Sequence, residues 1–205
     1  FLNGAMISKM KLPPFIATLA MMNIASGLAN TISERRPIYW EENGFLNALG
    51  EGGILGVSFY VLAGVLVMVL VICIYRYTRL RTNAYVIGGN EEVLHLSGVS
   101  VAKWKLIIYS LSGTLAGICG ILMNARVTCA DPTVGTGLEF SAVVGAVIGG
   151  NIQNTGKGSL WGAIVGALTL AVIRNGLSIM KTNTYWQMVL TGLILVVGML
   201  LREVS

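Results

Sequence analysis

Few side chains in this sequence could carry out covalent chemistry. The one histidine, His95, lies in a polar stretch between two apolar segments, and a hydrolase would need such a base beside a nucleophile or a metal. Asp131 and Glu139 are eight residues apart across a turn rich in glycine. An aspartate before proline favours a turn, and a glutamate suits the first turn of a helix. We therefore expect no catalytic residues.

Metal and nucleotide sites are also not expected. The three cysteines form no CxxC pair and lie within or at the ends of apolar stretches, which indicates small buried side chains: Cys73, Cys119 and Cys129. The loop GGNIQNTGKG, residues 149–158, resembles a phosphate-binding loop only in part. Five residues separate Gly150 from Gly156, and Gly158 stands where a serine or threonine would contact magnesium. We expect no metal and no cofactor in this chain.

Most of the sequence consists of long uncharged runs. The sequence is 55% hydrophobic and 11% charged, whereas a soluble domain carries about 25% charge. Runs of 22, 24, 20 and 20 uncharged residues occupy 12–33, 52–75, 106–125 and 182–201. Each is long enough to cross about 30 Å of hydrocarbon as a helix. The sequence predicts an all-α, polytopic transmembrane helix bundle, with about five or six membrane segments in a single domain over residues 1–205.

One membrane segment is too short to cross comfortably. Only 17 uncharged residues, many of them glycine, separate Glu139 from Lys157, which favours a short or re-entrant helix. Such a segment can line a translocation path, and the alternative is close helix packing through small residues. The candidate path residues are Thr136, Gly137, Glu139, Ser141 and Gly145. In the next apolar block, Arg174 is interpreted as snorkelling to the interface rather than as a charge in a pore.

Charge placement predicts the membrane orientation. Residues 76–104 and the adjoining Lys105 form a basic loop, whereas 34–51 is mainly acidic, so we expect the first to be cytoplasmic and the second external. Basic residues at the ends of apolar runs are typical of membrane anchors rather than of a nucleic-acid surface.

The cytoplasmic loop contains a short helix with its own start and stop signals. In GGNEEVLHLSG, Asn90 is a good N-cap, the two glutamates suit the first turn, and Gly98 suits a left-handed end, so we expect a helix over 91–97. A helix this short needs something to pack on, either a groove on a cytoplasmic partner or its own protein. The candidate docking residues are Gly88, Gly89, Asn90, Glu91, Glu92, Leu94, Leu96, Ser97 and Gly98.

Several linked motifs carry a family resemblance. YVIGGNEEVLHLSGVSVAKWKLIIYSLSGTLAGICGIL resembles the permease subunits of ribose-type sugar ABC importers, as do PPFIATLAMMNIASGLA, PTVGTGLEFSAVVGAVIGG and GKGSLWGAIVGAL. The resemblance covers nearly the whole chain and corresponds to the carboxyl-terminal two-thirds of the family. The family's GIDLSVG segment has no counterpart here, so we expect the amino-terminal spans to be missing from this sequence.

The resemblance implies a membrane subunit of an ATP-driven importer for a monosaccharide or a related small polar solute. It implies a multi-pass protein of the bacterial cytoplasmic (inner) membrane that pairs with a second permease subunit in a homodimer. It also implies cytoplasmic ATPase subunits that bind the ATP and contact the helix at 91–97, an extracytoplasmic solute-binding protein, and no nucleic acid. The alternatives are an ion-coupled secondary transporter, a channel, or a scaffolding membrane subunit. The near absence of ionisable residues in the spans favours an external energy source.

Overall fold

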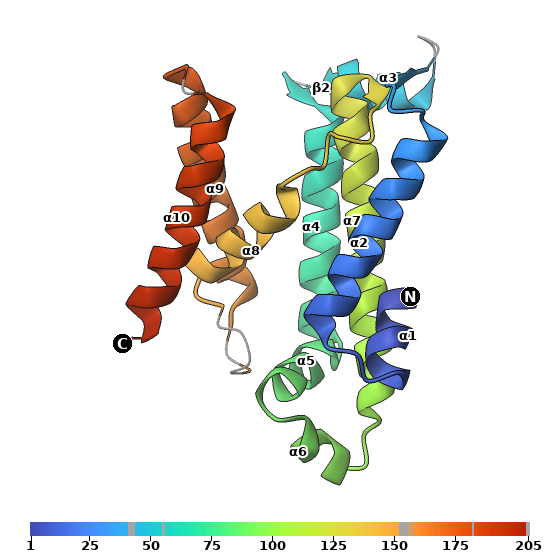
Figure 1. Ribbon diagram of the computed structural model, residues 1–205, viewed down its shortest axis with the longest axis vertical. Helices are drawn as coiled ribbons and strands as arrows, with labels where there is room; N and C mark the ends of the chain where they lie inside the picture. Colours follow the sequence, from blue (N-terminus) through green and yellow to red (C-terminus); the bar gives the residue numbers. More distant parts are fainter. Residues whose placement is uncertain (41–43, 55, 152–155, 157, 182, 204–205) are drawn as a thin grey trace. The chain divides into compact units, whose positions relative to one another are not determined.

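The computed structural model describes residues 1–40, 44–54, 56–151, 156, 158–181 and 183–203. The chain divides into two compact units (Figure 1). The first unit contains Phe1–Ile87 and Glu91–Gly135, and the second contains Gly88–Asn90 and Thr136–Ser205.

The first unit is built on long helices. Helices α2 (Pro14–Ile32), α4 (Phe59–Tyr77) and α7 (Val101–Val127) run lengthwise, and α1 (Leu2–Lys9) packs against α7 (Figure 1). One end of this unit carries α3 (Phe45–Glu51), with the antiparallel pairs β1 (Ile38–Tyr39) with β4 (Cys129–Ala130) and β2 (Gly53–Ile54) with β3 (Val57–Ser58). The other end carries α5 (Leu80–Gly89) and α6 (Glu91–Leu96).

Local sequence explains where these helices begin and how closely they pack. Helix α2 starts at Pro14, where a missing backbone N–H costs no hydrogen bond. Helix α7 starts after Ser100, whose side chain accepts a hydrogen bond from the Lys103 backbone N–H at 3.5 Å. Gly4 allows α1 to approach α7 closely. A Cβ atom at this position would lie 3.0 Å from the Leu106 Cα atom.

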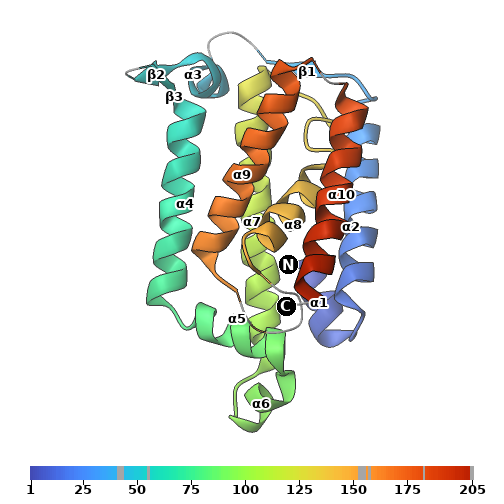
Figure 2. The same cartoon turned by 90° about the vertical axis from the view of Figure 1, so that its left-hand side faces the viewer.

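The second unit consists of α8 (Leu138–Ile148), α9 (Leu160–Ile179) and α10 (Thr184–Glu203). Figure 2 shows α9 and α10 running lengthwise, with the shorter α8 packed against them. At 11 residues, α8 is shorter than a membrane-spanning helix. The core of this unit lies between α8 and α9, where Val144, Val147 and Leu170 are buried.

Glycines determine how closely α8 and α9 approach. A Cβ at Gly145 would lie 3.0 Å from the Ala167 Cα atom. Cβ atoms at Gly149, Gly162 or Gly166 would overlap backbone atoms of the facing helix. The two helices therefore pack backbone against backbone, as small residues permit in membrane proteins.

The predicted fold class is confirmed. Among the described residues, α2, α4, α7 and α9 are long and apolar enough to cross a membrane, and α8 is a shorter apolar helix. Helix α4 buries none of its residues, and its exposed side chains are apolar except for Arg76 in its last turn. Such a surface is typical of a helix that faces lipid or other membrane helices.

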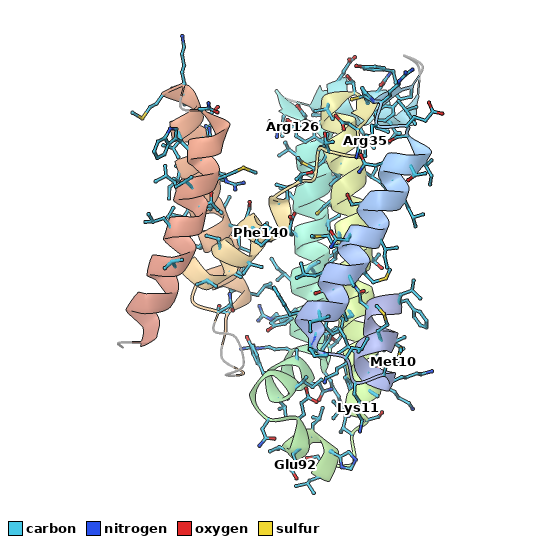
Figure 3. The ribbon with its side chains drawn as sticks, viewed as in Figure 1. Met10, Lys11, Arg35, Glu92, Arg126 and Phe140 are labelled. Carbon is cyan, nitrogen blue, oxygen red and sulfur yellow. The ribbon has the colours of Figure 1, made fainter. Side chains whose placement is uncertain are left out.

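Charged side chains lie at both ends of the first unit. Lys11 and Glu92 lie at the end with α5 and α6, and Arg35 and Arg126 lie at the opposite end (Figure 3). Two acidic residues of the predicted external loop, Glu41 and Glu42, lie outside the described residues, as do residues 152–155 and 157 of the GGNIQNTGKG loop. The orientation of the two ends across the membrane stays a prediction.

Candidate functional site

Helix α6 has a sharp, well-bonded end. The Ser97 N–H donates to the Val93 carbonyl at 3.2 Å, the Gly98 N–H donates to the His95 carbonyl at 3.0 Å, and the Val99 N–H donates to the Leu94 carbonyl at 3.3 Å. Gly98 has a φ of +74°, the left-handed conformation that the sequence predicted there. The chain turns at this glycine and enters α7 three residues later. Helices α6 and α7 are therefore joined by a short, defined turn.

A buried side chain and an ion pair help to fix the position of α6. Leu94 is buried, with 5% of its surface exposed. The Lys105 Nζ atom lies 2.6 Å from Glu91 Oε1, which joins the first turn of α6 to the first turns of α7. Sequence reasoning treated Lys105 only as a membrane anchor and missed this ion pair. In the sequence, this ion pair is indicated only by the opposite charges of the two residues. Their separation of 14 residues matches neither the spacing of helix neighbours nor that of a turn.

The exposed surface of α6 includes two apolar side chains. Val93 is 51% exposed and Leu96 is 81% exposed, and we call these two residues the α6 apolar pair. Glu92, which is labelled in Figure 3, is also exposed. Of the remaining predicted docking residues, Gly88 and Gly89 form the last two positions of α5, and Asn90 separates α5 from α6. The α6 apolar pair is thus the apolar surface that this short helix presents.

A cavity of about 970 Å³ lies beside α6 in the first unit. Its wall combines the turn between α1 and α2 with the turn between α6 and α7, through Lys11, Pro13, His95, Gly98 and Ser100. The α1–α2 turn therefore lies beside α6 at this cavity. The sequence did not indicate that these two segments are neighbours.

A second cavity, of about 400 Å³, lies within the second unit. Its wall includes Thr136 and Gly137 at the start of α8, Phe140 on α8, Arg174 on α9, and Gln187, Met188 and Thr191 on α10. Phe140 is labelled in Figure 3. Three helices therefore contribute both polar and apolar side chains to one space.

The structure separates the five candidate path residues. Thr136 and Gly137 line the second cavity. Glu139 is exposed in the first turn of α8, and the Ser141 hydroxyl donates to the Gly137 carbonyl at 2.8 Å. Gly145 lies at the contact with α9, the close packing that the sequence left open as an alternative.

Arg174 is held in the cavity wall. Its Nη2 donates to the Thr191 hydroxyl oxygen at 3.3 Å, and the Thr191 hydroxyl in turn donates to the Gln187 carbonyl at 2.7 Å. The Arg174 Nε is buried and has no acceptor among the residues that the structure describes. Whether the side chain also snorkels to the membrane interface stays a prediction. The guanidinium finds a hydroxyl on the neighbouring helix, a contact that hydropathy cannot indicate.

Asp131 stabilises the chain turn before α8. Its Oδ1 accepts hydrogen bonds from the Thr133 backbone N–H at 2.8 Å and from the Thr133 hydroxyl at 2.7 Å. These two hydrogen bonds, the backbone one first, lower the pKa of the Asp131 carboxyl below its ordinary value. Asp131 therefore serves the turn, as the sequence indicated.

Potential metal ligands do not gather in the described part of the chain. No group of three or more histidine, cysteine, aspartate or glutamate side chains there could hold a metal ion. Cys129 is buried, as the sequence predicted, but Cys73 and Cys119 are exposed on apolar helix faces. The prediction of burial was wrong for these two because an apolar run in a membrane helix also has an outward face.

The membrane-length helices and the capped loop helix define a polytopic membrane protein. Residues 1–199 match the protein family described as "Branched-chain amino acid transport system / permease component", and the chain belongs to this family. It is therefore a multi-pass protein of the inner membrane. Family membership favours the permease interpretation of the sequence over an ion-coupled transporter or channel.

Individual relatives extend the comparison. The chain is 35% identical over 201 residues to the ribose import permease protein RbsC of Escherichia coli strain K12, covering 97% of this chain and 63% of that protein. It is 32% identical over 200 residues to RbsC of Bacillus subtilis strain 168, covering 97% and 62%. The D-allose transport system permease protein AlsC of Escherichia coli K12 is 32% identical over 191 residues, covering 93% and 58%. The chain thus spans about three-fifths of the length of these relatives, and no solved structure matches it.

Proposed function

We propose that the protein is the membrane subunit of an ATP-driven importer for a monosaccharide or a related small polar solute. The observation that carries this proposal is α6, a short helix with a defined end, fastened to α7 and presenting the α6 apolar pair. An exposed apolar patch on a short, positioned helix fits a groove on a partner. The relatives named for ribose and allose import support the solute class.

The proposed partners follow the same logic. Two cytoplasmic ATPase subunits bind ATP, so this chain itself needs no nucleotide and no other cofactor. A second copy of the permease completes the membrane pathway, and an extracytoplasmic solute-binding protein delivers the solute. In this arrangement the loop 76–104 is cytoplasmic, and α6 is the coupling helix.

Coupling requires that movement of the ATPases reaches the membrane helices. The Glu91–Lys105 ion pair, the hydrogen bond from the Val99 N–H to the Leu94 carbonyl and the short turn at Gly98 all connect α6 to the start of α7. A displacement of α6 is therefore transmitted to α7 rather than absorbed in a loose loop. The driving free energy is the difference in ATP affinity between the open and closed states of the ATPases.

The test is recovery of the ATPase with the permease. The variant Val93→Ser/Leu96→Ser removes the α6 apolar pair but leaves Leu94, Glu91 and Gly98 in place. If the α6 apolar pair is the energetic centre of the interface, its loss costs about 2 kcal/mol or more, and ATPase copurification from detergent-solubilised membranes should fall about tenfold or more. The measurement is the ratio of ATPase to permease in the purified sample.

A matched control lies at the opposite end of the first unit. Ile54 and Val57 are 56% and 40% exposed, in β2 and β3, so Ile54→Ser/Val57→Ser removes comparable apolar surface. We expect this control to retain the ATPase. Equal losses in the two double variants would contradict docking through α6. Failure to recover any ATPase with the unmodified protein would contradict the ATP-driven proposal itself and favour ion coupling.

A further inference from the structure

The cavity among α8, α9 and α10 carries a further inference. We propose that it is a binding site for a neutral, polyhydroxylated ring of monosaccharide size, with Arg174 as its principal hydrogen-bond donor. The proposal rests on the proposed importer function and adds a specific resting place for the solute within the membrane subunit. A volume of about 400 Å³ is within the range of small-molecule sites.

The Arg174 guanidinium is held in position, but its hydrogen-bond donors are not all satisfied. A guanidinium carries five N–H donors, and among the described residues Arg174 donates one hydrogen bond, to Thr191. Thr191 is only 6% exposed, and its own proton is donated to the Gln187 carbonyl, so its oxygen acts as the acceptor for Arg174. Thr191 therefore positions the guanidinium, while the buried Nε of Arg174 has no acceptor among the described residues.

A guanidinium in a membrane helix is costly unless it has a function or a partner. No acidic side chain is among the described residues that line this cavity. A ligand that brings oxygen acceptors would satisfy donors that the protein leaves unused, so binding gains hydrogen bonds to a charged group.

The rest of the wall favours a neutral hydroxylated ring over a compact anion. Thr136 lies before α8 in the cavity wall, and its hydroxyl can both donate and accept a hydrogen bond, as sugar hydroxyls do. Phe140, Val144 and Met188 supply apolar surface for the C–H faces of a ring. A site for a compact anion would instead concentrate several donors on one point.

Cysteine protection tests the site directly. The full-length permease, assembled with its ATPase in membrane vesicles, first has Cys73, Cys119 and Cys129 replaced by serine. A single cysteine is then placed by Met188→Cys, which lines the cavity, or by Val189→Cys, which does not. Both native side chains are 55% exposed, so the two positions are matched in accessibility. The labelling rate with a small thiol reagent is measured with and without D-ribose, and separately with D-ribonate as the anionic probe.

We expect D-ribose to slow labelling at position 188 and to leave position 189 unchanged. In the Arg174→Gln background, the D-ribose concentration for half-protection should rise about tenfold or more, because a charged donor is lost. Thr191→Val should raise it by a smaller factor while retaining the charge, and it provides a second test where Arg174→Gln fails to reach the membrane.

Three results would overturn the proposal. These are equal effects of D-ribose at positions 188 and 189, unchanged half-protection in both the Arg174 and the Thr191 variants, and protection by D-ribonate but not by D-ribose. ATPase recovery is scored in the same vesicles. An importer that retains its ATPase but shows no protection therefore fails this proposal alone, whereas loss of the ATPase partner counts against the proposed function.

Discussion

The turn that joins α6 to α7 and the contact between α8 and α9 are held together in opposite ways. The first depends on one buried leucine, an ion pair and a left-handed glycine. The second depends on glycines that bring two backbones into contact. Polar contacts suit a helix in an aqueous loop, whereas helices in lipid gain little from apolar burial and rely on close packing. The difference predicts that the α8–α9 pair tolerates no added atoms, while the α6 turn can move as one piece.

The largest effect should follow from adding one methyl group between α8 and α9. In Gly166→Ala, the new Cβ would overlap the Gly145 carbonyl oxygen and the Gly149 backbone. Because backbone atoms cannot swing away as a side chain can, we expect destabilisation at or above the top of the usual overpacking range of about 1–3 kcal/mol. The measurement is the thermal unfolding midpoint of the purified protein in detergent.

Gly176→Ala is the matched control within the same helix. No atom lies within 4 Å of a Cβ placed at Gly176. This substitution should be neutral or stabilising by up to about 1 kcal/mol, because alanine has a higher helix propensity than glycine. A similar midpoint for the two variants would show that close backbone contact does not hold α8 to α9.

The sequence predicted the features that depend on local rules. The uncharged runs predicted the long helices. The capping residues predicted a helix over 91–97 and a left-handed Gly98; the helix ends one residue earlier, at Leu96. The short length of α8 followed from the distance between Glu139 and Lys157. These features could be predicted because hydropathy and helix capping act over a few neighbouring residues.

Contacts between distant residues could not be predicted in the same way. The Arg174–Thr191 hydrogen bond and the Glu91–Lys105 ion pair depend on which helices become neighbours. The pairing of β1 with β4 involves two residues on each strand, too few for any alternation to show. The cavity of the second unit likewise depends on how α8, α9 and α10 pack, which the sequence alone does not indicate.

An intermediate effect is expected at the turn after α6. Gly98→Val places a β-branched residue at a φ of +74°, which costs about 1–2 kcal/mol. If the turn transmits motion from α6 to α7, solute uptake and solute-stimulated ATPase activity should both fall while the amount of protein in the membrane is unchanged. Radiolabelled uptake and phosphate release in the reconstituted importer measure the two activities.

Gly56→Val imposes the same kind of strain at the opposite end of the first unit. Gly56 has a φ of +83°, and, as at Gly98, no atom lies within 4 Å of an added Cβ. We expect this variant to retain uptake. If both valine variants lose uptake equally, backbone strain alone explains the loss, and the turn at Gly98 has no special role in coupling.

The smallest effect should come from the ion pair between α6 and α7. Lys105 is 17% exposed and Glu91 is 52% exposed, so solvent screens the pair, and its contribution to stability is about 1 kcal/mol or less. Glu91→Lys should lower uptake about two- to fivefold, because two like charges then separate the first turns of α6 and α7. The exchanged pair Glu91→Lys/Lys105→Glu should restore uptake, and the deficit of the single variant should shrink as salt is raised. If the exchanged pair stays as defective as Glu91→Lys, Glu91 acts by contacting the partner directly, and the turn at Gly98 couples α6 to α7 without help from the ion pair.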